Sequence, residues 1–188
     1  MSDKRTAPDQ LDLVIDFVNT LDLETGEEAL GDPDALSAWL SGRGLLEEGE
    51  RAGAEDLARA RDLREALRAR MLANNGGPDA EPAEGLLEAV ARRGELSVRF
   101  EDGTATLRPC ADGLDGALAL LLAPVAEAMA NDTWGRVKAC RADDCHFAFY
   151  DFSRNRAGTW CDMAVCGNRQ KVRAYRERTP RISASGTG

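Results

Sequence analysis

Residues 140–166 read CRADDCHFAFYDFSRNRAGTWCDMAVC and contain four of the five cysteines in the chain. Their spacing is Cys140-x4-Cys145-x15-Cys161-x4-Cys166, which is two short pairs joined by a longer loop. Zn²⁺ takes four ligands in a tetrahedron, and two such pairs can wrap two turns onto one ion. The spacing therefore predicts a structural zinc site, because four thiolates leave no open position for water.

Disulfides and an iron–sulfur cluster are the alternatives to zinc for these clustered cysteines. Disulfides need an oxidising compartment, and the first residues, MSDKRTAP, lack the apolar core of a secretory signal. An iron–sulfur cluster also takes four thiolates and stays open as an alternative. We expect His146, the only histidine, to begin a strand over residues 146–150, because adjacent ligands would strain the turn. The fifth cysteine, Cys110, is expected in or near the core.

The segment after the last cysteine, residues 167–178, is rich in cations and compatible with a helix. Three of its arginines recur at i, i+4 and i+7 and form one basic stripe, which consists of Arg169, Arg173 and Arg176. A further basic group lies in the loop before Trp160. Because Arg and Lys contact phosphates, the residues expected to bind nucleic acid are Arg154, Arg156, Arg169, Lys171, Arg173, Arg176 and Arg178. The simpler alternative is a solvated basic helix without a nucleic-acid partner.

Apolar and aromatic side chains of the same region are expected to surround the metal. Val172 and Tyr175 lie off the basic stripe, so we expect them to face the metal core. We expect burial for most of the four aromatic residues Phe147, Phe149, Tyr150 and Trp160. Exposed rings would instead stack on RNA bases or anchor a protein partner.

The formal charge of −9 hides an uneven distribution. Residues 1–133 hold 13 Lys and Arg against 28 Asp and Glu, whereas residues 134–188 hold 11 against 5. The two charges are −15 and +6, and the second falls to about +4 when four thiolates and one Zn²⁺ are counted. The acidic part could compete with DNA for the basic part. Ion pairs from Arg169, Arg173 and Arg176 to the acidic part would weaken the case for DNA.

Residues 1–133 show the patterns of several helices and one β-hairpin. Periodicity and end signals predict helices over 9–23, 32–42, 50–75, 81–93 and 114–130, the last kinked or divided at Pro124. For residues 9–23 a strand is the alternative, because the stretch contains β-branched residues. Alternation predicts a hairpin over 96–108. The expected fold class is mainly α with a small β-hairpin (α+β), a helical N-terminal domain followed by a small zinc-bound β-hairpin and helix module.

Two stretches of the chain resemble known families. The run Phe149-x-Asp151-x-Ser153-Arg154-Asn155-Arg156, followed by Trp160-Cys161-x-Met163-x-x-Cys166-Gly167-Asn168-Arg169-x-Lys171, resembles the CGNR zinc finger. The runs Asp16-Phe17-Val18-Asn19-Thr20 and Leu36-x-x-Trp39-Leu40-x-x-x-Gly44-Leu45-Leu46 resemble the ABATE domain that usually precedes it. The resemblance implies a bacterial, stress-induced transcription regulator with a DNA-binding C-terminus.

The same resemblance implies site residues and shows two departures. By the motif match, Cys140, Cys145, Cys161 and Cys166 are the zinc ligands. This chain has Gly158-Thr159 where the family often has basic residues, and Asp162 where it often has Ser. Both departures remove positive charge from the expected binding surface.

We expect a helical ABATE-like domain over 1–133, a CGNR-type zinc finger over 134–181 and a flexible tail over 182–188. The predicted function is a DNA-binding transcription regulator whose N-terminal domain senses a small-molecule effector or mediates association as a homodimer. Asp16 and Asn19, one helical turn apart, are the candidate effector ligands. The alternative function is a zinc-stabilised module that binds protein or RNA.

The sequence also excludes several function classes. It contains no glycine-rich phosphate loop, no nucleophile elbow and no histidine before residue 146, so we expect no enzyme. The longest apolar run, residues 117–126, is about half the roughly 20 residues that a bilayer crossing needs. We therefore expect a cytoplasmic protein with no membrane partner.

Overall fold

The computed structural model describes residues 7, 8 and 10–178, and the tail predicted over 182–188 lies outside this part. Six helices form the acidic body: α1 (Leu11–Val18), α2 (Pro33–Ser41), α3 (Ala54–Ala73), α4 (Glu81–Arg93), α5 (Gly113–Leu120) and α6 (Ala123–Ala130). A hairpin of β1 (Ser97–Glu101) and β2 (Thr104–Arg108) joins α4 to α5. These elements confirm the predicted fold class, which is mostly helical with small antiparallel strand pairs.

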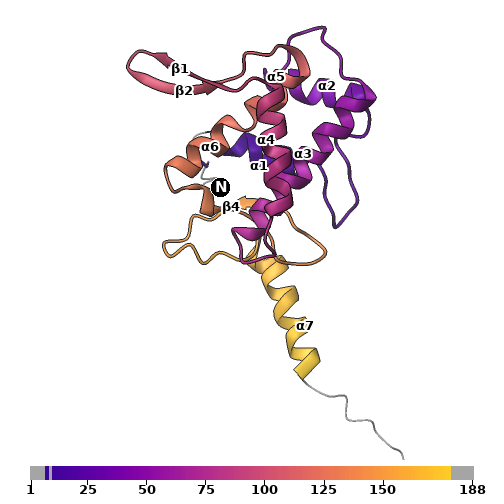
Figure 1. Cartoon of the computed structure of the whole chain (residues 1–188). Coiled ribbons are helices and arrows are strands. Elements are labelled where there is room, and N and C mark those ends of the chain that lie inside the picture. The colour runs from indigo at the N-terminus through magenta and orange to yellow at the C-terminus, as the bar shows by residue number, and fades with distance from the viewer. Residues whose placement is uncertain (1–6, 9, 179–188) are drawn as a thin grey trace, which may run out of the picture.

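The C-terminal part is a small module with its own strand pair. A 3₁₀ turn, η1 (Trp134–Arg136), leads into β3 (Val137–Ala139), which pairs antiparallel with β4 (Ala148–Tyr150). A π-helical turn, η2 (Met163–Gly167), then leads directly into α7 (Asn168–Arg178). Figure 1 shows α7 extending away from the body, at the opposite end from the β1–β2 hairpin.

Local sequence signals explain where the helices begin and end. The Asp32 carboxylate accepts a hydrogen bond from the Ala35 amide at 2.8 Å and caps α2, and Pro33 lies in the first turn. The apolar stretch over 114–130 is divided, because α5 ends before Leu121 and Pro124 lies in the first turn of α6. Helix α3 begins at Ala54, four residues later than predicted.

One hydrophobic core unites the body with the strands of the C-terminal module. Its largest fully buried side chains come mainly from α1, α2, α3 and the region of α5, among them Phe17, Leu67 and Leu118. The same core includes Trp134, Val137, Ala139 and Ala148, which belong to η1, β3 and β4. The module therefore does not depend on the metal alone for stability, since its strands bury apolar surface against the body.

The helical stretch Gly113–Ala130 is long and apolar enough to cross a membrane. It is the only such stretch within residues 7, 8 and 10–178, and half of it is buried inside the body. A core helix of a soluble protein passes the same test, so this stretch is weak evidence for a membrane span.

Candidate metal centre and basic helix

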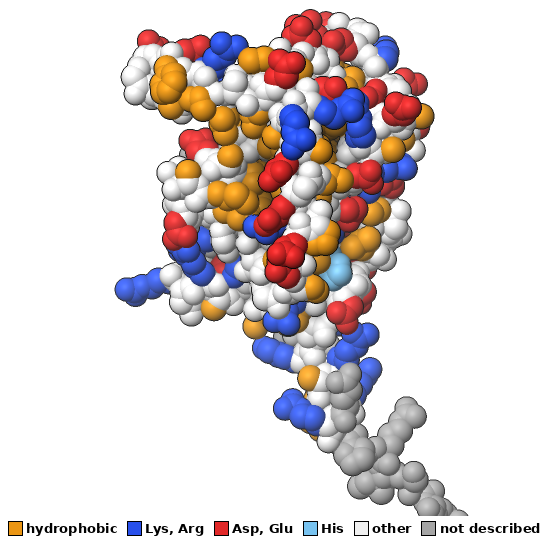
Figure 2. Space-filling model, viewed as in Figure 1, with side chains coloured by type: hydrophobic (Ala, Val, Ile, Leu, Met, Phe, Trp, Pro, Cys, Tyr) orange, Lys and Arg blue, Asp and Glu red, His pale blue; other side chains and the backbone are white. Residues whose placement is uncertain are grey.

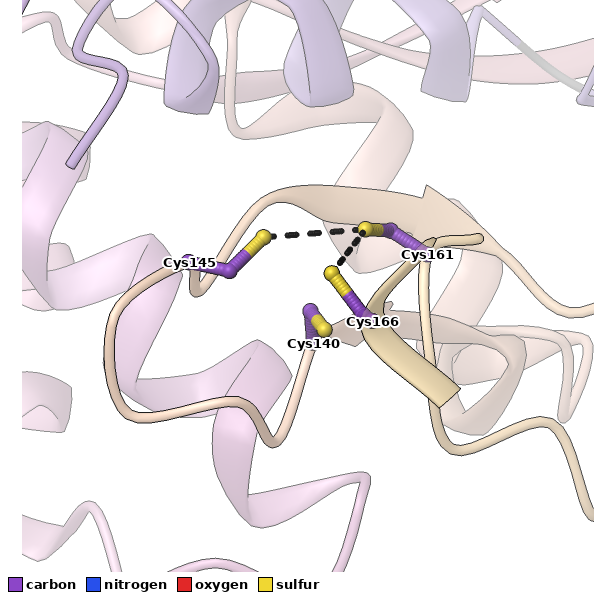
Figure 3. Close-up of side chains that lie close together, drawn as sticks. All are labelled: Cys140, Cys145, Cys161 and Cys166. Carbon is purple, nitrogen blue, oxygen red and sulfur yellow. Dashed lines mark hydrogen bonds between the residues drawn. The ribbon is translucent and has the colours of Figure 1, made fainter. Parts of the chain in front are cut away.

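The four clustered cysteines come from separate local structures and meet at one point. Cys140 follows β3, Cys145 lies in the turn before β4, Cys161 follows a long loop, and Cys166 belongs to η2. Their sulfur atoms all lie within 4.8 Å of one another, and Figure 3 shows the side chains converging. None of the four forms a disulfide.

The sulfur spacing matches a tetrahedral metal site. Sγ of Cys161 lies 3.6 Å from Sγ of Cys145 and 3.7 Å from Sγ of Cys166. Four sulfurs at about 2.3 Å from a central zinc lie about 3.8 Å apart along each edge of the tetrahedron. A disulfide would instead hold two sulfurs at about 2.05 Å. The cluster therefore has the dimensions of a four-thiolate zinc site.

The pKa values of the thiols also favour a bound cation at this cluster. A hydrogen bond with Cys161 lowers the pKa of Cys140 to about 5, and the same contact raises the pKa of Cys161. Burial raises the pKa of Cys145 to about 12. Four neighbouring thiolates cannot all be ionised unless a cation shares their charge. Zn²⁺, which prefers sulfur and tetrahedral geometry, fits this donor set.

Residues near the ligands shape the second turn of the site. The Asp162 carboxylate accepts hydrogen bonds from the Ala164 amide at 2.7 Å and the Val165 amide at 3.0 Å, which begins η2. A serine oxygen can accept such bonds as well, so this departure from the family pattern keeps the turn while adding negative charge. A Cβ on Gly167 would lie 3.0 Å from Trp160 Cδ1, so a glycine permits close packing beside Cys166.

A buried ion pair, which the sequence did not reveal, holds the loop before Cys161. The Lys138 ammonium donates to Asp151 Oδ2 at 2.8 Å, to the Arg156 carbonyl at 2.6 Å and to the Gly158 carbonyl at 3.0 Å. Both charged side chains are at most 5% exposed. Burial would raise the pKa of Asp151, but the bonds from Lys138, Ser153 and Gly158 outweigh burial and lower it.

The same ion pair explains Gly158, the first departure from the family pattern. The Gly158 amide donates to Asp151 Oδ2 at 2.8 Å. A Cβ on Gly158 would lie only 2.7 Å from an Asp151 carboxylate oxygen, which is closer than real contacts allow. A basic side chain at this position would therefore displace the loop in this chain.

Side chains of the body hold the module through its backbone. Asn19 and Ala148 exchange two hydrogen bonds, at 3.0 Å and 2.7 Å, so the amide pairs with β4 as a strand would. The Asn75 amide donates to the carbonyls of Ala139 and Thr159, both at 2.8 Å. Buried Arg68 donates to the carbonyl of His146 at 3.0 Å. These contacts fix the metal site against the body.

Two of these anchors concern residues with other predicted roles. Asn19 lines a cleft of about 690 Å³ together with Asp16, Trp39 and Phe147. Its side-chain amide is already paired, while Asp16 is exposed. His146 lies in the turn before β4 with a positive φ of 49°, so the prediction that it begins the strand is wrong by two residues.

The basic residues lie mainly on α7, and their environments differ. Arg169 donates to Glu24 of the body at 2.6 Å and to Cys166 Sγ at 3.4 Å. Arg173 lies 3.7 Å from Asp143 within the module. Arg154, Lys171 and Arg176 form no ion pair with any described residue and are exposed. Of Arg169, Arg173 and Arg176, only Arg169 forms an ion pair with a described residue of the body.

The side chains of two other basic residues, Arg156 and Arg178, form one exposed contact each with a described residue. Arg156 pairs with Asp132 at 3.0 Å, where the body meets the module. Nε of Arg178 donates to the Ala174 carbonyl of the same helix at 3.1 Å. Both side chains are exposed, so these contacts are solvated and weak.

The prediction that Val172 and Tyr175 face the metal core is wrong, since they are 48% and 66% exposed. Helix α7 leaves the module immediately after the last cysteine, and the small core around the metal is filled by Ala142 and Trp160 instead. Trp160 is half-buried, as are Phe149 and Tyr150, while Phe147 is exposed. Cys110 is exposed, contrary to its predicted place in or near the core.

Comparison with protein-family models identifies both parts of the chain. Residues 11–135 match the ABATE model, described as "Putative stress-induced transcription regulator". Residues 136–179 match the CGNR zinc finger. A comparison with curated protein sequences gave no match. The four cysteines and the finger model together establish zinc as the cofactor. The chain belongs to the ABATE family of transcription regulators and carries a C-terminal CGNR zinc finger.

Proposed function

We propose that the chain regulates transcription by binding DNA through α7. The observation that carries this proposal is the exposed surface of the helix. At 100° per residue, Arg173 and Arg176 lie on one side of an apolar strip formed by Val172 and Tyr175, and Lys171 lies on the other side. An exposed helix with cations on both sides of its outer face suits a groove lined by phosphates.

The contact between Arg169 and the body changes the role of that arginine. Its guanidinium is occupied by Glu24 and by the sulfur of Cys166, so it orients the first turn of α7 relative to the metal. Arg156 is paired with Asp132 of the body as well, so we assign phosphate contacts to the five cations with no ion pair to the described body, which are Arg154, Lys171, Arg173, Arg176 and Arg178. Five contacts would give a slope of log K against log salt of about −4 to −5 on duplex DNA.

The binding proposal is tested by fluorescence anisotropy with zinc-loaded protein and labelled duplex DNA across a salt series. Arg176→Ala should weaken binding at low salt and make the slope shallower by about 1. The control is Arg92→Ala, which removes an exposed arginine on α4, in the body. Binding without salt dependence, or equal losses from the two variants, would contradict the proposal.

The exposed ring of Tyr175 is the observation that favours the alternative function, which is RNA binding. Tyr175 is exposed between cations, and aromatic rings beside cations stack on unpaired bases. Single-stranded RNA of equal length should bind more weakly than duplex DNA if α7 acts through phosphates on a duplex. Tighter binding to RNA that is lost in Tyr175→Ala would favour the alternative.

We further propose that the protein acts by binding rather than by catalysis, and in the cytoplasm. Four thiolate ligands leave zinc no position for a reactive water, which supports a structural metal. We assign no effector to Asp16 and Asn19, because the Asn19 side-chain amide is already paired with the backbone of Ala148. Incubation with common esters and nucleotides should give no zinc-dependent turnover.

A further inference from the structure

The β1–β2 hairpin has one apolar face and one polar face. Val98 pairs with Leu107 and Phe100 pairs with Ala105, so these four side chains share a face. The opposite face carries only polar or charged residues, which are Ser97, Arg99, Glu101, Thr104, Thr106 and Arg108. Such strict alternation is typical of a hairpin whose apolar face is covered.

Within the part of the chain that the structure describes, most of that face is uncovered, and only Leu107 is half-buried. Phe100 is 83% exposed and Val98 is 53% exposed. The hairpin extends from the body beyond the ends of the neighbouring helices (Figure 1). A two-stranded hairpin is marginally stable on its own, and apolar exposure of this kind marks an interaction surface.

A groove lies directly beside the apolar face. It has a volume of about 620 Å³ and runs between the hairpin and α6. The α6 wall combines the exposed carboxylate of Glu127 with small side chains that leave room for a ring, which are Ala123, Pro124, Ala126 and Ala130. Val98 and Leu107 form part of the hairpin wall. Figure 2 shows hydrophobic side chains continuing from the hairpin onto the body. A protruding ring and a small-residue groove are therefore neighbours on one surface.

We propose that a second copy of this chain covers this face, with the two hairpins antiparallel and each Phe100 in the groove of the other copy. A two-fold interface requires a surface that complements itself. The ring and the groove meet this requirement, because a two-fold axis between them brings each Phe100 to the other copy's α6.

The charges of the hairpin fit the antiparallel arrangement. Glu101 and Asp102 outnumber Arg99 near the tip and leave it with a net negative charge, while Arg108 lines the groove and places a positive charge at the base. Antiparallel hairpins set each acidic tip against the basic base of the partner, whereas parallel hairpins would bring two acidic tips together. A strand of five residues spans about 17 Å. The contact is accordingly small, and we expect a dissociation constant in the micromolar range.

The dimer is tested by sedimentation velocity on the full, zinc-loaded chain between 1 and 200 µM. The mass should rise with concentration from 20.3 kDa toward twice that value. Phe100→Ser should raise the dissociation constant by at least about tenfold, as expected for a buried aromatic anchor. Because Phe100 is exposed in the single copy, the variant should keep its circular dichroism spectrum.

A matched control and a charge swap test whether the hairpin itself forms the dimer interface. Leu23→Ser removes another exposed apolar side chain, outside the hairpin and the groove, and should leave the dimer unchanged. Glu101→Lys and Arg108→Glu should each weaken the dimer, and the double variant should restore it. A monomer at every concentration, equal weakening by Leu23→Ser, or no restoration in the double variant would overturn the proposed interface.

Discussion

Replacing Lys138 tests whether the buried ion pair holds the loop that carries Cys161. In Lys138→Met the ammonium and its three hydrogen bonds are lost, while the Asp151 carboxylate stays buried. Removing one partner of a buried pair costs about 3–5 kcal/mol. The amides of Ser153 and Gly158 still donate to the carboxylate, which places the cost near the lower limit.

The expected loss can be measured as a change in unfolding free energy. A loss of about 3 kcal/mol lowers the Tm of a chain of this size by about 6–12 °C. Urea denaturation of zinc-loaded protein measures the loss directly. Arg141→Met is the control, because it removes an exposed cation of the same module and should change stability by less than about 0.5 kcal/mol.

The pH dependence of the loss gives a second measurement. In the wild-type protein the pKa of Asp151 is lowered, so its contribution is complete above about pH 4 and is lost as the pH falls further. Without Lys138, the pKa of Asp151 lies higher than in the wild-type protein, because only the bonds from Ser153 and Gly158 then oppose burial. The stability difference between the two proteins should therefore shrink as the pH falls from about 5 to about 3. A loss below about 1 kcal/mol, or one independent of pH, would refute this reasoning.

Three further outcomes follow from the contacts around the module. Asn19→Ala should cost about 1–3 kcal/mol in urea denaturation, because the Ala148 amide and carbonyl lose their partner; unchanged stability would show that water replaces the side chain. Gly158→Ala should lower the free energy of unfolding by about 1–3 kcal/mol, because its methyl group meets Asp151. Gly135→Ala is the control, because a Cβ at Gly135 meets nothing within 4 Å. Removing zinc with a strong chelator should lower the Tm yet leave most helical circular dichroism, since the cysteines form a cluster separate from the main core; loss of all helical signal would contradict this.

Periodicity and spacing were sufficient to predict most elements and the metal cluster. Helix α4 has the predicted bounds, and the hairpin lies within the predicted range 96–108. Both signals are local, since a helix repeats its apolar positions every three or four residues. The metal cluster could also be predicted from the sequence, because two short-spaced pairs of cysteines limit how the chain can enclose one ion.

Tertiary contacts between distant residues could not be predicted in this way. Lys138 and Asp151 are ordinary charged residues in the sequence, and only the pairing of β3 with β4 brings them together in the interior. Asn75 resembles a simple helix end, yet its amide joins two carbonyls of the module. Tyr175 follows a helical period, but the period does not say whether a neighbouring element covers that side of the helix.

The strands β3 and β4 have a consequence for the order in which the protein is made. Trp134, Val137, Ala139 and Ala148 complete the core of a body whose helices are synthesised earlier. A nascent chain that ends before Ala148 therefore exposes apolar surface on α1 and α3 and leaves the Asn19 amide without its partner. The acidic body reaches its final packing only after the finger's strands have left the ribosome, so a premature stop in the finger would also yield an unstable body.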